Sequence, residues 1–104
     1  MRVEDAVRIE FSDEVDPGTL AALHAHGLDA TLPPEVEALF EAADVRDVTP
    51  VYTMSEEEIA TDAIGFAAEF VLYLRPGARA DGVLAQLRRS PLILNAEPVY
   101  LEEA

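Results

Sequence analysis

Residues that could carry out catalysis or hold a metal are few in this chain, and their spacing suits neither role. His24 and His26 lie two positions apart in a stretch with helical periodicity, so their side chains point to different faces and make poor co-ligands. Near a helix C-terminus, both are better explained as groups that favour the negative end of the helix dipole. The chain has no cysteine, which excludes thiolate metal sites and disulfide bonds. The sequence therefore predicts no metal site and no cofactor.

The serines are equally poor candidates for a nucleophile. Ser12, Ser55 and Ser90 fall at predicted turns or helix ends, where a hydroxyl group ordinarily caps backbone groups, and none stands in a nucleophile-elbow pattern. A glycine-rich phosphate-binding loop is also missing from the sequence. The segment after the first predicted strand, residues 12–16, is acidic and would repel a phosphate group. The sequence therefore predicts a protein that has no catalytic residues and is not an enzyme.

Charge restricts the kinds of partner that the chain can bind. The formal net charge is −14, from 21 acidic residues against 7 basic ones, and every basic residue is an arginine. Such a chain lacks the basic footprint that nucleic acids require and would be repelled by anionic membranes. A hydrophobic content of 50% distinguishes it from disordered acidic tails, which are poor in core-forming residues. We therefore expect a folded domain with a protein partner and with no nucleic-acid or membrane partner.

Apolar periodicity and turn signals predict a series of short strands and helices. In chain order they are a strand at 7–11, a helix from Asp16-Pro17 to Gly27, a helix near 33–43, a strand at 45–54, a strand at 70–74, a helix at 81–89 and a strand at 92–101. An acidic connection over 54–65, with one helical turn that begins at Ser55, separates the second and third strands. Because proline cannot donate to a strand ladder, Pro50 and Pro98 place their strands at the edges of the sheet.

These elements predict an α+β fold, the ferredoxin-like split β-α-β sandwich, in which a four-stranded antiparallel sheet carries helices on one face. The segment Leu20-Ala21-Ala22-Leu23 after the first strand is echoed by Leu84-Ala85-Gln86-Leu87 after the later one, as two β-α-β halves would produce. Chance similarity between leucine-rich and alanine-rich helices is the alternative explanation. Right-handed crossovers would place the first and third strands at the centre.

The third strand indicates where a partner would bind. Phe70, Leu72 and Leu74 share one face of this strand, and Val71 and Tyr73 share the other. If the first set packs against the helices, the second set lies on an uncovered face and forms an apolar patch that suggests a partner. A long loop or a second copy of the chain covering this face is the alternative.

Segments in the last third of the chain resemble a known family. They are residues 71–77 (VLYLRPG), 82–87 (GVLAQL) and 90–100 (SPLILNAEPVY). A hydrophobic strand, a Pro-Gly turn, a helix with paired leucines and a closing Ala-Glu-Pro strand resemble the propeptide domain of subtilisin-like serine proteases. The first two-thirds match only by element order, with the helix near 33–43 and the connection over 54–65 as insertions. The resemblance implies one propeptide-like domain over residues 1–104.

The resemblance implies a domain that inhibits a subtilisin-like serine protease or assists its folding, in cis or in trans. In that family the open sheet face packs on two protease helices, and the C-terminal tail lies in the substrate cleft like a bound product. Here the sheet face corresponds to Glu69, Val71 and Tyr73. The tail corresponds to Pro98, Val99, Tyr100, Leu101, Glu102, Glu103 and Ala104. On residue pattern alone, this acidic end would be a frayed terminus.

Acidic residues near the second and third strands have a further role in that family, where they cap the N-termini of the protease helices. A helix N-terminus presents unpaired N–H groups and partial positive charge, so a carboxylate of a partner can cap it. The candidates here are Glu56, Glu57, Glu58 and Asp62, together with Glu69. The alternative is an acidic run that is simply solvated.

Two other functions remain open on the sequence. The chain could be a free-standing cytosolic protein-interaction or regulatory domain of the same fold, as a monomer or a homodimer, with a partner that is not a protease. It could also be a small-molecule sensor of the regulatory split β-α-β type. The start at Met1 has no signal-peptide pattern, so we expect a cytoplasmic protein if Met1 is the native start and a secreted one if a signal was removed.

Overall fold

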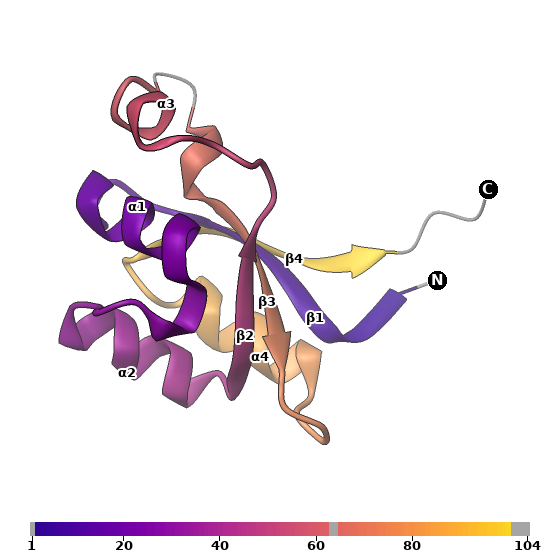
Figure 1. Cartoon of the computed structure of the whole chain (residues 1–104). Helices are drawn as coiled ribbons and strands as arrows, with labels where there is room; N and C mark the ends of the chain where they lie inside the picture. Colours follow the sequence, from indigo (N-terminus) through magenta and orange to yellow (C-terminus); the bar gives the residue numbers. More distant parts are fainter. Residues whose placement is uncertain (1, 63–64, 101–104) are drawn as a thin grey trace.

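Strands and helices follow one another largely in the predicted order (Figure 1). The computed structural model describes residues 2–62 and 65–100 of the chain. The elements are β1 (Arg2–Phe11), α1 (Pro17–His26), the 3-10 turn η1 (Gly27–Asp29), α2 (Pro34–Ala42), β2 (Val45–Pro50), α3 (Glu56–Ala60), the 3-10 turn η2 (Phe66–Ala68), β3 (Glu69–Leu74), α4 (Ala80–Arg88) and β4 (Ile93–Tyr100).

The strands form one antiparallel sheet in the order β2-β3-β1-β4. β1 and β3 are central, and the strands that contain Pro50 and Pro98 are at the edges. The predicted α+β fold is confirmed, and the arrangement is that of a ferredoxin-like split β-α-β sandwich with the crossover helices on one side of the sheet (Figure 1).

Local signals set the ends of the first helix, which covers part of the sheet. The Asp16 carboxylate accepts a hydrogen bond from the Thr19 N–H at 2.9 Å, and Pro17 occupies the first helical turn. Gly27 ends the helix with a φ of 58°, and a Cβ there would lie 3.3 Å from the Val48 carbonyl oxygen. Both the backbone conformation and the close approach of β2 therefore require glycine at this position.

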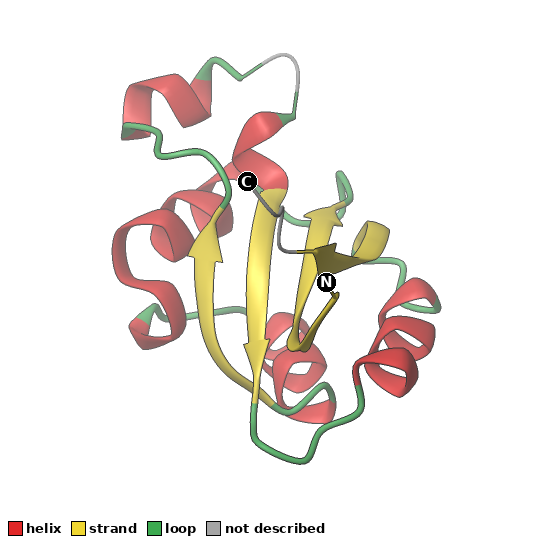
Figure 2. Cartoon of the chain, turned by 90° about the vertical axis from the view of Figure 1, so that its right-hand side faces the viewer, coloured by secondary structure: helices red, strands yellow, loops and turns green. Residues whose placement is uncertain are grey.

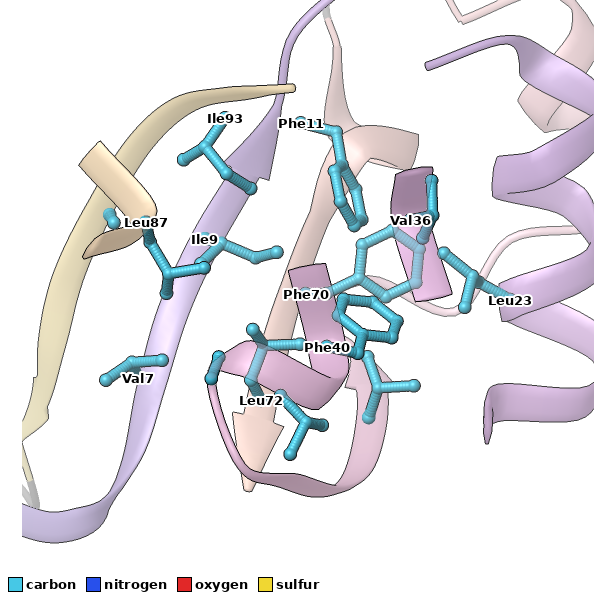
Figure 3. Close-up of a cluster of buried hydrophobic side chains, with 14 of the residues drawn as sticks. Val7, Ile9, Phe11, Leu23, Val36, Phe40, Phe70, Leu72, Leu87 and Ile93 are labelled. Carbon is cyan, nitrogen blue, oxygen red and sulfur yellow. The ribbon is translucent and has the colours of Figure 1, made fainter. Parts of the chain in front are cut away.

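The core lies between the helices and one face of the sheet (Figure 3). Phe70 stands at its centre, where its ring packs edge-on against the ring of Phe11 with centroids 5.5 Å apart. Leu23 of α1, Val36 of α2 and Leu87 of α4 reach the same cluster and are almost completely buried. One continuous core therefore joins the two β-α-β halves.

Some predicted boundaries are wrong, for identifiable reasons. The strand predicted over 45–54 ends at Pro50, which pairs with Phe70, and one more backbone hydrogen bond follows, from the Val51 N–H to the Glu69 carbonyl oxygen at 3.0 Å. Proline has no N–H of its own to donate to the ladder, and the segment 51–54 leaves the sheet. β1 begins at Arg2 rather than at Val7. The acidic connection, by contrast, does contain the predicted helical turn, as the short helix α3, which begins at a capping box between Ser55 and Glu58.

Both edge strands have backbone groups that are satisfied from within the chain. The Arg88 guanidinium donates to the Ala96 carbonyl oxygen of β4 from Nε at 3.0 Å and from Nη2 at 2.8 Å. On β2, the Val48 N–H donates to the Asp47 carboxylate at 2.9 Å. Because each edge strand also contains a proline, the sheet offers an incoming strand an interrupted ladder.

Candidate functional site

The two faces of β3 are used as the sequence predicts. Phe70, Leu72 and Leu74 are 0% exposed and face the helices. Val71 and Tyr73 alternate with them, are half-buried, and lie on the face that carries no helix, which we call the open face (Figure 2). Strand register places further residues on the open face, namely Ala6, Arg8 and Glu10 of β1, Asp47 and Thr49 of β2, Glu69 of β3, and Asn95 and Glu97 of β4.

A broad depression of about 750 Å³ occupies the middle of the open face. Its floor includes Val71 and Tyr73, and one side of it is formed by Pro98 and Val99 of β4. The other residues that line it are Arg8, Thr49, Pro50, Val51 and Glu97. Residues predicted for the sheet face and residues predicted for the start of the tail therefore border the same depression.

A large irregularity in the pairing of β1 with β4 shapes this side of the depression. Val3 pairs with Val99 and Val7 pairs with Pro98, so that residues 4–6 have no partner on β4 while β4 advances by one residue. Such a bulge bends the strand that contains the extra residues. The start of β1 and the end of β4 accordingly turn out of the plane of the sheet as a two-stranded ribbon (Figure 1).

Arg8 is the cation at the centre of the open face. Its Nη2 lies 2.8 Å from Glu69 Oε1 on β3, and its Nε lies 3.8 Å from Glu97 Oε1 on β4, so one guanidinium bridges three strands. The hydrogen bond with Glu69 is the largest cause that raises the pKa of Arg8. Arg8 is therefore committed mainly to Glu69 and makes a longer, weaker contact with Glu97.

Tyr73 is partly covered by groups from neighbouring strands. The Arg46 guanidinium lies 5.8 Å from the centre of the Tyr73 ring and 3.9 Å from the Asp5 carboxylate. Ala6, which is directly opposite Tyr73, is only 1% exposed although it lies on the open face. The open face is thus a small apolar floor framed by charged groups, rather than the bare apolar patch that the sequence led us to expect.

Sequence reasoning missed an aromatic pair beside the open face. Tyr52 and Phe66 are 40% and 42% exposed, and their ring centroids are 4.8 Å apart. They come from the segments that follow β2 and precede β3, and Tyr52 is close enough to Arg8 to help raise the pKa of Arg8. The only signal in the sequence was that these are the two aromatic residues of the connection over 51–68.

Of the acids predicted to cap partner helices, at least two cap helical segments of this chain. Glu58 accepts the Ser55 N–H at 3.0 Å and completes the capping box, and this backbone hydrogen bond lowers the pKa of the Glu58 carboxyl group. Asp62 accepts the N–H groups of Gly65 and Ala67 at 3.1 and 2.8 Å, at the start of η2. These carboxylates therefore have a local structural role.

Glu56 and Glu57 are exposed on α3, but this helix packs against α1 rather than beside the open face. Glu69 does lie on the open face, where it is paired with Arg8. The structure therefore separates the predicted capping residues from the predicted sheet face, with Glu69 as the exception.

Only the first residues of the predicted tail belong to the described part of the chain. Pro98 and Val99 are half-buried beside the depression, and the backbone of Tyr100 still pairs with that of Arg2. Leu101, Glu102, Glu103 and Ala104 lie outside the described residues. The described part of the predicted tail thus belongs to the ribbon that borders the depression.

His24 and the serines serve local structure. His24 Nε2 lies 2.9 Å from the Ala67 carbonyl oxygen, and its ring packs edge-on against Phe70. Ser12 donates to the Pro91 carbonyl oxygen at 2.6 Å, and the Ser90 hydroxyl accepts the Leu92 N–H at 3.2 Å. Residues 2–62 and 65–100 contain no group of His, Asp and Glu side chains that could hold a metal, and none of their helices could cross a membrane.

The arrangement of the open face can support binding to another macromolecule through apolar contact and charge. Within the described residues, Arg8 pairs with Glu69 and Glu97, and Arg46 pairs with Asp5. Comparisons of the chain with protein-family models, with curated proteins and with solved structures give no match.

Proposed function

We propose that this domain binds a protein partner through the open face and the C-terminal segment together, and that the partner is a subtilisin-like serine protease, which the domain inhibits or helps to fold. The observation that carries this proposal is the shared depression. Val71 and Tyr73 of the sheet face and Pro98 and Val99 of the tail line the same depression, so one partner can contact both.

Occupied backbone groups and prolines at the sheet edges favour a partner that docks on the open face over a partner that adds a strand to the sheet. Strand addition needs a row of free backbone groups along an edge. Here Arg88 occupies the Ala96 carbonyl oxygen on β4, Asp47 occupies the Val48 N–H on β2, and proline interrupts each ladder. A partner would therefore meet the side chains of the open face.

A partner that contacts the open face and the tail at the same time would be bound more tightly than by either contact alone, even though neither contact changes. Once the open face is docked, the segment after Val99 is held close to the partner, and its binding becomes effectively intramolecular. An extended segment that follows β4 can then form backbone hydrogen bonds in a cleft of the partner. This combination suits an inhibitor that occupies a substrate cleft.

Charge favours a different protein over a second copy of the chain as the partner. The formal net charge of −14 would make two copies repel each other at close range, and the open face itself has more carboxylates than guanidinium groups. A homodimer through this face would therefore need charge compensation that neither copy supplies.

The decisive experiment measures inhibition of a panel of purified subtilisin-like proteases by the full chain and by a variant that lacks residues 101–104. We expect inhibition of at least one protease by the full chain and a loss of about 100-fold in the truncated variant, because the cleft contact is removed while the face remains. Circular dichroism of the truncated variant controls for folding. Equal inhibition by both chains would contradict the role of the tail, and inhibition of no protease would reject this class of partner.

The role of the face is tested by Tyr73→Glu, which places a carboxylate in the depression. We expect partner affinity to fall by at least tenfold while the fold is retained, because Tyr73 is half-buried and lies outside the core. Ala85→Glu is the matched control, since it adds the same charge at an exposed position of α4. Equal losses for both variants would mean that net charge, rather than the open face, controls binding.

A further inference from the structure

The open face has an excess of negative charge that its own arginines do not neutralise. Register places Glu10, Asp47, Glu69 and Glu97 on it together with Arg8, and Arg46 reaches over Tyr73. Among the side chains that the structure describes on this face, four carboxylates therefore share two guanidinium groups, and one of these, Arg46, contacts Asp5 rather than any of the four.

Glu10 is the least compensated of these carboxylates. It lies directly opposite Glu69 across β1 and β3, and directly opposite Asn95 across β1 and β4. Like charges that face each other across a strand pair are destabilising. Glu69 is held by Arg8 at 2.8 Å, whereas Glu10 has no ion pair among the side chains described over 5–62 and 65–99.

Glu97 is the second carboxylate that a partner could use. Its distance from Arg8 is 3.8 Å, against 2.8 Å for Glu69, and its side chain is 52% exposed. Arg8 is already committed to Glu69, so a cation from outside would gain an attractive contact with Glu97 at little cost to the existing pair. Glu97 also borders the depression, next to Pro98 and Val99.

We propose that the partner of the open face presents basic side chains beside an apolar ridge, with lysine or arginine contacting Glu97, opposite Arg8 on β4, and Glu10, two residues along β1, while apolar groups cover Val71 and Tyr73. This inference rests on the open face being the binding surface, as proposed above, but it does not require that the partner be a protease. Such an arrangement would offset the repulsion between the Glu10 and Glu69 carboxylates. It would also make association with the partner fast and dependent on the salt concentration.

The test uses an amphipathic helical peptide of leucine and lysine as the probe, with a second peptide that carries glutamate in place of every lysine. NMR chemical-shift mapping on the ¹⁵N-labelled full chain, at about 0.15 M salt, locates the binding surface. We expect the lysine peptide to shift the amides of Arg8, Val71 and Glu97 most strongly, and the glutamate peptide to cause no shifts.

Variants separate recognition by this face from general attraction to an acidic chain. The double variant Glu10→Gln/Glu97→Gln should weaken binding of the lysine peptide by about fivefold to tenfold. Glu35→Gln/Glu41→Gln on α2 changes the net charge equally at exposed positions and should leave the affinity unchanged. Equal weakening by both double variants, shifts spread over α2 and α3, or no binding of the lysine peptide would each overturn the inference.

These outcomes are distinct from those of the protease assay. Chemical-shift changes on the open face without inhibition of any protease would support a partner with basic and apolar groups. They would also show that this partner is not a subtilisin-like protease. Inhibition of a protease that is insensitive to Glu10→Gln/Glu97→Gln would support the proposed function and reject the charge contacts.

Discussion

The two sides of β3 differ in what surrounds them, although the strand is only six residues long. Phe70, Leu72 and Leu74 are sealed by helices, and their neighbours are other hydrophobic side chains of the core. Val71 and Tyr73 are half-buried among ionisable groups that pair with one another. One face of a single strand therefore supports the fold, and the other remains available for recognition, so substitutions on alternate residues should have separate consequences.

Leu72→Ala tests the covered side and should have the largest effect. Removing a completely buried leucine side chain loses its transfer free energy and leaves a cavity, which together lower the free energy of unfolding by about 2–5 kcal/mol. The neighbouring Val71→Ala should cost about 1 kcal/mol, because this side chain is half-buried. Urea unfolding of both variants measures the difference. Similar losses would mean that the open face carries as much of the stability as the core.

Asp16→Ala tests how much one cap of a covering helix contributes. The Thr19 N–H would lose its acceptor at the start of α1, so we expect the free energy of unfolding to fall by about 1 kcal/mol. Asp13→Ala is the matched control, because Asp13 is exposed and lies in the same loop, and its substitution removes the same charge. A larger effect from Asp13→Ala in urea unfolding would contradict the assignment of Asp16 as the cap.

A double-mutant cycle tests whether the ion pair on the open face stabilises the domain. Arg8→Met and Glu69→Gln, alone and together, should give a coupling energy of about 0.5–1 kcal/mol, because the pair is short and only partly exposed. The same cycle on Arg46 and Asp5 should give a coupling near zero, since this pair is 3.9 Å apart and half-exposed. A larger coupling for the second pair would reverse the ranking of these contacts.

The capping box of α3 should be visible as a pH effect. Because the pKa of Glu58 is lowered in the folded chain, its contribution is present above the pKa of the unfolded state and disappears as the pH falls through the folded-state value. An NMR titration of the side-chain carboxyl groups should place Glu58 below the usual value of about 4.3. Ser55→Ala should raise it. A pKa of Glu58 that does not respond to this substitution would contradict the capping box.

The fold could be predicted because local signals and the overall pattern agreed. Alternating burial in β3, the Asp16-Pro17 start of α1 and the prolines of the edge strands each depend on neighbours in the sequence, and together they select one topology. The end of β2 was misplaced because apolar residues continue past Pro50, where the ladder stops. Local hydrophobicity alone does not mark such an end.

The candidate site was predicted only in part, because its chemistry depends on register between strands. Alternation along β3 identifies Val71 and Tyr73, but the Arg8 contacts with Glu69 and Glu97 bring together residues that are 61 and 89 positions apart. The pairing of Tyr52 with Phe66 and the bulge at residues 4–6 likewise arise only when the sheet is assembled. Periodicity assigns residues to faces, whereas contacts across the sheet require the structure.

The blocked edges of the sheet have a consequence for the behaviour of this domain at high concentration. A protein that leaves one sheet face accessible risks joining copies of itself into fibrous assemblies if its outer strands are also free. The Arg88 bonds to Ala96, the Asp47 bond to Val48 and the two edge prolines interrupt that route. We therefore expect the domain to keep an accessible recognition face with little tendency to polymerise.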